Sequence, residues 1–182
     1  MDLDWNAQLL DQLDWHWRHQ LRPRLDGLTD DEYLWEPVPG SWSVRPRGES
    51  TAPIAAGSGA FTIDFALPEP DPPPVTTIAW RLGHVLVGVF GARNAAHFGG
   101  PPVSYDGFDY PGTAAGALAQ LDEAYARWAD GVRTADLGAP CGPAEGEYAD
   151  WPMAALVLHV NREAIHHGAE MALLRDLYRA RR

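Results

Sequence analysis

Hydrophobic side chains recur along much of the chain every three or four residues, the spacing typical of a helix with one buried face. This pattern predicts long helices over residues 5–28, 77–98, 113–132 and 151–178. Thr76 or Thr77 is expected to cap the second helix, and Pro23 lies inside the first one at the risk of a kink. Four amphipathic helices predict an all-α fold, a four-helix bundle with at least one long crossover connection.

The connections between these helices are rich in proline and glycine. Residues 29–32 begin with a threonine followed by acidic residues, which predicts a capped turn or a short helix. Residues 34–44 place aromatic side chains among helix breakers, so we expect an ordered loop there. Residues 45–74 are expected to form an irregular, partly mobile Pro/Gly-rich insertion before the second helix, with a brief strand-like run at 61–65. The whole chain, residues 1–182, is expected to be a single domain.

The last predicted helix is unusual because polar side chains interrupt its buried stripe. At helical spacing this stripe consists of Leu156, Val160, Glu163, His167, Glu170, Leu174 and Leu177. Burying an ionised carboxylate without a partner is costly, so Glu163 and His167, one turn apart, indicate a shared cation. The alternative is an ion pair on the helix surface, and the spacing alone favours neither interpretation.

A metal site between helices needs a donor from a second helix, and His84 is the candidate. Gly88 and Gly91 lie on the same stripe, where small residues would leave room for an ion and a substrate. With water at a fourth position, His84, Glu163 and His167 would form the donor set of a catalytic zinc site. The alternative for His84 is a hydrogen-bonded histidine of the core.

Three further residues of the last helix compete for a place in this site. His159 is also one turn from Glu163 and could replace His167 as its partner. His159, His166 and Glu170 are therefore interpreted as residues around the ligands or as alternative ligands. A fourth ligand from His159 or His166 would close the site and make it structural rather than catalytic. No residue is marked as a catalytic nucleophile.

Charge and cysteine content narrow the classes of partner and metal. The chain has 14 basic and 25 acidic residues and a formal net charge of −11, which would repel nucleic acid and anionic membranes. No apolar run reaches the roughly 18 to 20 residues of a membrane span, and the acidic start is unlike a signal peptide, so a cytoplasmic protein is expected. Because Cys141 is the only cysteine, a metal must be held by histidine and carboxylate. Zinc is favoured, with nickel or iron as alternatives.

Three passages of the sequence resemble the DinB superfamily, which includes the mycothiol-dependent maleylpyruvate isomerase N-terminal domain and related bacterial thiol transferases. These passages are residues 77–84, 34–44 and 160–170, the last with the trailing residues 174–177. The resemblance implies a four-helix bundle that binds a divalent metal through a histidine of the second helix and a His-x-x-x-His or Glu-x-x-x-His pair of the last. These positions fall on His84, Glu163 and His167. Many relatives have histidine where this chain has Glu170, and the long insertion also departs from the family pattern.

The resemblance also implies an activity. Characterised members use the metal to activate a low-molecular-weight thiol, which predicts a thiol-dependent S-transferase or isomerase acting on a small-molecule substrate. One alternative is a metal-dependent hydrolase in which the ion activates water. Another is a non-catalytic metal-binding or stress-response module. A homodimer is compatible with each of these functions.

Overall fold

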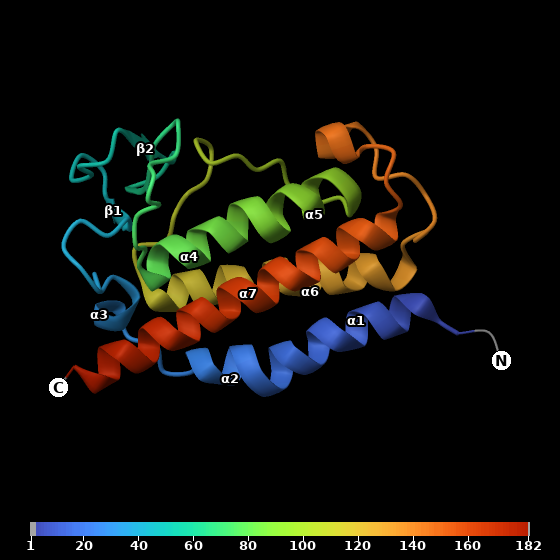
Figure 1. Ribbon diagram of the computed structural model, residues 1–182, viewed down its shortest axis with the longest axis horizontal. Helices are drawn as coiled ribbons and strands as arrows, with labels where there is room; N and C mark the ends of the chain where they lie inside the picture. Colours follow the sequence, from blue (N-terminus) through green and yellow to red (C-terminus); the bar gives the residue numbers. More distant parts are fainter. Residues whose placement is uncertain (1–2, 182) are drawn as a thin grey trace.

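The computed structural model describes residues 3–181, which are mostly helical with a small three-stranded sheet (Figure 1). Two uninterrupted long helices, α6 (Ala114–Thr134) and α7 (Met153–Ala180), occupy the third and fourth predicted positions. The first helical run consists of α1 (Trp5–His16), the π-helical segment η1 (Trp17–Leu21) and α2 (Arg22–Leu25). The second consists of α4 (Ile78–His84), the π-helical segment η2 (Val85–Gly91) and α5 (Ala92–His97).

Side-chain caps begin these helices where the sequence predicts them. Thr77 accepts a hydrogen bond from the Trp80 backbone N–H at the start of α4, and Thr113 caps α6 in the same way. Thr29 and Glu32 form a reciprocal capping box around the short helix α3 (Asp30–Tyr33). Because each cap satisfies backbone donors that the first helical turn leaves unpaired, these positions determine where the helices start.

The π-helical segment η1 lies one turn before the internal proline. The Arg22 N–H bonds to the Trp17 carbonyl, five residues back, which widens the helix at this point. Proline lacks an N–H and its ring collides with the carbonyl four residues earlier, so a wider turn before Pro23 relieves the conflict. The predicted helix therefore continues through Pro23 as far as Leu25.

Residues 44–65 contain an antiparallel sheet, which the all-α prediction missed. Its strand order is β1-β3-β2, with β1 at Val44–Pro46, β2 at Ile54–Ala56 and β3 at Phe61–Phe65. Val44 and Ala56 flank Ile63 of the central strand from its two sides. Only β3 had a recognisable strand pattern. The outer strands are three residues long, too short for alternation to reveal them. The prediction for residues 45–74 is therefore corrected at these two strands.

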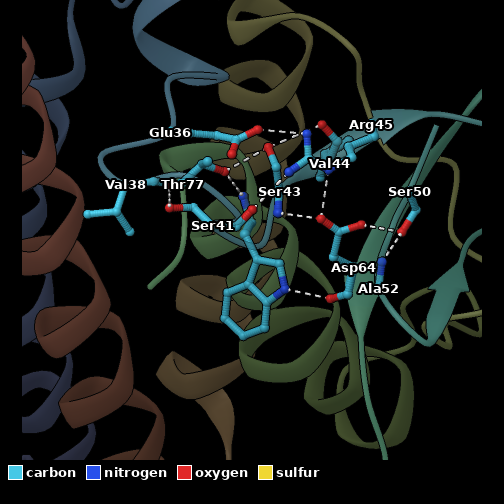
Figure 2. Close-up of polar contacts among 11 residues, drawn as sticks. Glu36, Val38, Ser41, Ser43, Val44, Arg45, Ser50, Ala52, Asp64 and Thr77 are labelled. Atoms are coloured by element: carbon cyan, nitrogen blue, oxygen red, sulfur yellow. Dashed lines mark hydrogen bonds and ion pairs between the residues drawn. The ribbon is translucent and has the colours of Figure 1, made fainter. Parts of the chain in front are cut away.

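A buried carboxylate ties the sheet together (Figure 2). Asp64 Oδ2 accepts hydrogen bonds from the Ser43 backbone N–H and from Arg45 Nε, both at 2.9 Å. The Ser50 hydroxyl donates to Asp64 Oδ1 at 2.5 Å, and Arg45 NH1 donates to Glu36 Oε1 at 2.8 Å. Since a buried charge is tolerated only when it is paired and hydrogen-bonded, this network explains how the insertion is ordered.

The same sheet holds the first turn of α4. The Ser43 and Thr77 hydroxyls lie 3.0 Å apart, and the Trp80 indole N–H donates to the Asp64 carbonyl at 2.8 Å. Trp80 then stacks on the His84 ring, with centroids 5.5 Å apart and planes at 11°. The insertion therefore positions His84 through the tryptophan one turn before it.

The long helices pack side by side around a common core (Figure 1). Both α6 and α7 contact α1, α4 and η2. The buried face of α7 follows the predicted stripe as far as His167 and then differs from it, because Arg175 and Tyr178 are buried whereas Leu177 is 48% exposed. The prediction that Leu177 is buried was wrong. Arg175 is buried on this face of α7 instead, because its charge is paired with that of Glu32. Across residues 3–181, each helix is too short or too polar to cross a membrane.

Candidate metal centre

His84 of α4 and His167 of α7 face one another across the interface between these helices. Their ring centroids lie 4.8 Å apart with the planes at 85°. Glu163 precedes His167 by one turn of α7, and its Oε2 lies 3.7 Å from His167 Nε2. The His167 ring is buried, whereas His84 and Glu163 are half-buried. The structure thus brings the three predicted residues together; their role as ligands stays a prediction.

The Nδ1 atom of each imidazole is already in hydrogen-bonding contact with a neighbouring side chain. His167 Nδ1 lies 2.7 Å from Glu170 Oε2, and His84 Nδ1 lies 2.8 Å from the Tyr105 hydroxyl. A carboxylate only accepts, so His167 Nδ1 donates to Glu170, and in the neutral ring Nε2 then presents a lone pair. Burial raises the pKa of Tyr105 to about 12, so its hydroxyl stays protonated and can accept from His84 Nδ1. Both rings can therefore offer Nε2 to a cation, as metal-bound histidines do when a second group holds Nδ1.

Tyr105 was missed at the sequence level. It lies in the connection between α5 and α6, where no periodic pattern or motif marks it. A Cβ added at Gly88 would lie 2.5 Å from the Tyr105 hydroxyl and 3.2 Å from the His84 ring. The space at Gly88, predicted to admit an ion and a substrate, instead allows Tyr105 to reach His84.

The residues present fit a divalent cation of the zinc type. Two imidazole nitrogens and one carboxylate are the donor set of many catalytic zinc sites. The Tyr105 and Glu170 contacts provide the outer hydrogen bonds that such sites use to orient histidine ligands. The donor chemistry and the orientation of the rings therefore agree with a metal-dependent protein.

A second donor group shares His167. Among the described residues, His166, His167 and Glu170 each offer one ligand atom, and these three atoms lie within 4.8 Å of one another. In this group the Glu170 carboxylate also pairs with Arg81 Nε at 3.1 Å. His166 is largely exposed, and its Nε2 lies 3.4 Å from Glu170 Oε1. The two alternative groups thus share His167 and differ in their other two members.

His159 contacts the opposite side of Glu163. Its Nδ1 lies 3.7 Å from Glu163 Oε1, whereas Glu163 Oε2 faces His167. Arg162 NH2 donates to His159 Nδ1 at 2.7 Å, so this nitrogen acts as an acceptor. Burial lowers the pKa of His159 below its ordinary value, which favours the neutral ring. His159 therefore contacts the Glu163 oxygen that faces away from His167.

We expect the metal-free protein to lose stability in acid through His84. Burial, followed by the neighbouring His167 and Arg81, lowers the pKa of His84 from 6.5 to about 4, and Glu163 and Glu170 offset only part of this. Between pH 6.5 and 4 the unfolded chain binds more protons at this residue, so its stabilising contribution, complete above pH 6.5, falls as the pH is lowered. Acidification from pH 7 to pH 5 should lower the free energy of unfolding by about 2 kcal/mol through this group.

Urea unfolding in the presence of a chelator measures this effect. The native protein should lose about 2 kcal/mol more between pH 7 and pH 5 than the His84→Asn variant, in which the group is absent. Equal losses in the two proteins would show that the His84 ring is not held neutral by burial.

Comparison with known proteins adds one finding. The sequence model of the DinB superfamily matches residues 60–171, a segment that includes all of the residues considered for the metal centre. No curated protein and no solved structure matches the chain.

Proposed function

The chain belongs to the DinB superfamily, and on this basis we propose that it is a divalent-metal-dependent enzyme, a small-thiol-dependent S-transferase or isomerase. The observation that carries this proposal is the approach of His84 to His167 with Glu163 beside them. We infer that the long helical runs form the four-helix bundle of this superfamily, with the sheet as an insertion before the second run. The ion would then lie between the second and last helices.

We assign His84, Glu163 and His167 as the ligands in preference to His166, His167 and Glu170. In the second group, the 2.7 Å contact of His167 Nδ1 with Glu170 is a hydrogen bond, which orients the ring. Arg81 already compensates the Glu170 charge. In the first group, both histidines have Nδ1 engaged and Nε2 available, and Glu163 has one oxygen directed to His167.

The residues around the ligands each have a role that the contacts support. A divalent ion in this position would supply Lewis-acid chemistry, lowering the pKa of a bound thiol or water to near neutrality. Glu170 accepts from His167 Nδ1, and the Tyr105 hydroxyl would accept from His84 Nδ1 when Nε2 of that ring binds the ion. Trp80 fixes the plane of the His84 ring by stacking on it. Three protein ligands leave a coordination position for a reacting molecule.

Steady-state assays of the metal-loaded protein test this proposal. With Zn²⁺ bound, conjugation of 1-chloro-2,4-dinitrobenzene to mycothiol or N-acetylcysteine should exceed the spontaneous rate and should be lost on chelation. A Glu163→Gln variant should lose at least about 100-fold in rate, because it removes the anionic ligand. A native rate in the His84→Ala variant would contradict the proposal.

The same preparations separate the alternatives. A hydrolase would cleave p-nitrophenyl acetate at a rate that does not depend on added thiol. A non-catalytic metal-binding module would show neither activity, yet its melting temperature would still fall on chelation because the ion binds only the folded state. Either result would replace the thiol-dependent function with the corresponding alternative.

A further inference from the structure

A cavity of about 370 Å³ is lined by residues near the start of α7. The start of α7 lies at the end of the long helices opposite the sheet (Figure 1). The cavity is bounded by α5, α7 and the short 3₁₀ helix η3 (Pro143–Tyr148). Its volume is within the range of small-molecule sites. The principal lining side chains are Arg93, Tyr148, Trp151, Leu156, His159 and Arg162. None of the proposed metal ligands is among its lining residues.

The cavity nevertheless adjoins the metal centre. His159 and Arg162 line it, and both approach Glu163 Oε1, at 3.7 and 3.3 Å. Arg93 also lines the cavity, and its NH1 donates to the Gly88 carbonyl at 2.5 Å, next to the His84 ring. A molecule in the cavity would therefore lie beside the residues that surround the ligands.

The charge of the lining favours an anion. Glu145 also lines the cavity, but its carboxylate is engaged by Arg93 at 3.2 Å and by His97 at 3.0 Å. The guanidinium of Arg162, on an exposed side chain, contacts His159 and Glu163 at the edge of the cavity. Arginine binds carboxylate and sulfonate groups through charge-assisted hydrogen bonds. Two arginines against one carboxylate give the lining residues a formal charge of +1, in a chain with a net charge of −11.

Two exposed aromatic side chains supply an apolar wall. Tyr148 and Trp151 are 50% and 55% exposed, although large aromatic side chains usually bury most of their surface. Their rings contact each other edge to face, with centroids 5.2 Å apart at 79°. Such amphipathic rings are typical of surfaces that receive a flat apolar ligand.

We propose that this cavity binds the second substrate of the metal centre, a small organic anion whose flat apolar body packs on Tyr148 and Trp151 and whose anionic group binds Arg162. The term substrate rests on the proposed function. Binding itself depends only on the cavity and can be measured without the ion.

Two fluorescent probes that differ in charge test the proposal. 8-Anilinonaphthalene-1-sulfonate carries an anionic group on an aromatic body, and N-phenyl-1-naphthylamine has a similar body without it. Arg162→Gln should weaken binding of the sulfonate about tenfold and change binding of the neutral probe less than about twofold. Trp151→Ala should weaken binding of both probes at least about fivefold.

Matched controls are available on α1. Arg18→Gln removes another exposed arginine with an acidic partner, and Trp15→Ala removes another half-exposed tryptophan. Both controls should leave the two dissociation constants within about twofold of the native values. Because Arg162 and Trp151 are themselves exposed, their variants should fold, and equal melting temperatures will verify this. Unchanged sulfonate binding in Arg162→Gln, or unchanged binding of both probes in Trp151→Ala, would overturn the proposal.

Zinc titration links the cavity to the metal centre. Where metal analysis shows one bound ion, adding Zn²⁺ should tighten binding of the sulfonate probe to the native protein at least about threefold, by adding positive charge near the cavity. No change under these conditions would overturn the assignment to a second substrate. If no ion binds at all, the proposed function fails, whereas the effects of the Arg162 and Trp151 variants still decide whether the cavity binds organic anions.

Discussion

Replacing His84 with alanine is expected to weaken Zn²⁺ binding more than about 100-fold. Removal of a group that merely orients a ligand typically costs 10–100-fold in metal affinity, and loss of a ligand should exceed that. His84 comes from a different helix than the other two donors, so it is the residue that joins the site across the helix interface. Competition with a fluorescent chelator of known affinity, together with metal analysis of the purified protein, measures the change.

The His166→Ala variant provides the discriminating control. If the ion is held by His84, Glu163 and His167, removing the exposed His166 should leave the affinity within about twofold of the native value. If the ion is held by His166, His167 and Glu170, the two variants exchange their effects, with a large loss of affinity for His166→Ala and little for His84→Ala.

The Tyr105→Phe variant should weaken Zn²⁺ binding about tenfold in the same competition measurement, because it removes only the partner of His84 Nδ1.

Replacing Glu32 with glutamine is expected to lower the free energy of unfolding by about 3 kcal/mol or more. The Arg175 side chain is only 2% exposed, and its Nε and NH2 lie 3.2 and 3.3 Å from the Glu32 carboxylate. Burial alone would raise the pKa of Glu32, but hydrogen bonds from Arg175 and the Thr29 backbone N–H outweigh it and lower that pKa. Removing the negative charge leaves a buried guanidinium uncompensated, which typically costs about 3–5 kcal/mol.

Asp31→Asn is the matched control for this change. Asp31 is exposed in the same short helix, so its replacement should alter stability by no more than about 0.5 kcal/mol. Replacing both Glu32 and Arg175 with methionine should recover most of the lost stability, because no buried charge then remains. Urea unfolding of the three variants and the native protein tests the comparison. A loss for Glu32→Gln as small as that for Asp31→Asn would contradict the buried ion pair.

The helices and their starting points were predictable because they depend on local features. A repeat of three and four residues defines the buried face of a helix within the helix itself, and Thr77 and Thr113 cap backbone donors only a few residues away. The same regularity placed Glu163 and His167 one turn apart on α7. Their association with His84 came from the resemblance to a family and from the need for a donor on another helix.

Contacts between distant parts of the chain were decided only by the tertiary structure. The outer strands acquire their structure by pairing with β3, and Arg175 can be buried because Glu32, far earlier in the sequence, lies opposite it. The connection between α5 and α6 brings the Tyr105 hydroxyl to 2.8 Å from His84 Nδ1, a contact that no local sequence pattern marks. Sequence spacing determines which side chains share one face of a helix. The packing of the whole chain determines which of these side chains contact a neighbouring helix or loop, because those contacts depend on long-range burial and charge compensation.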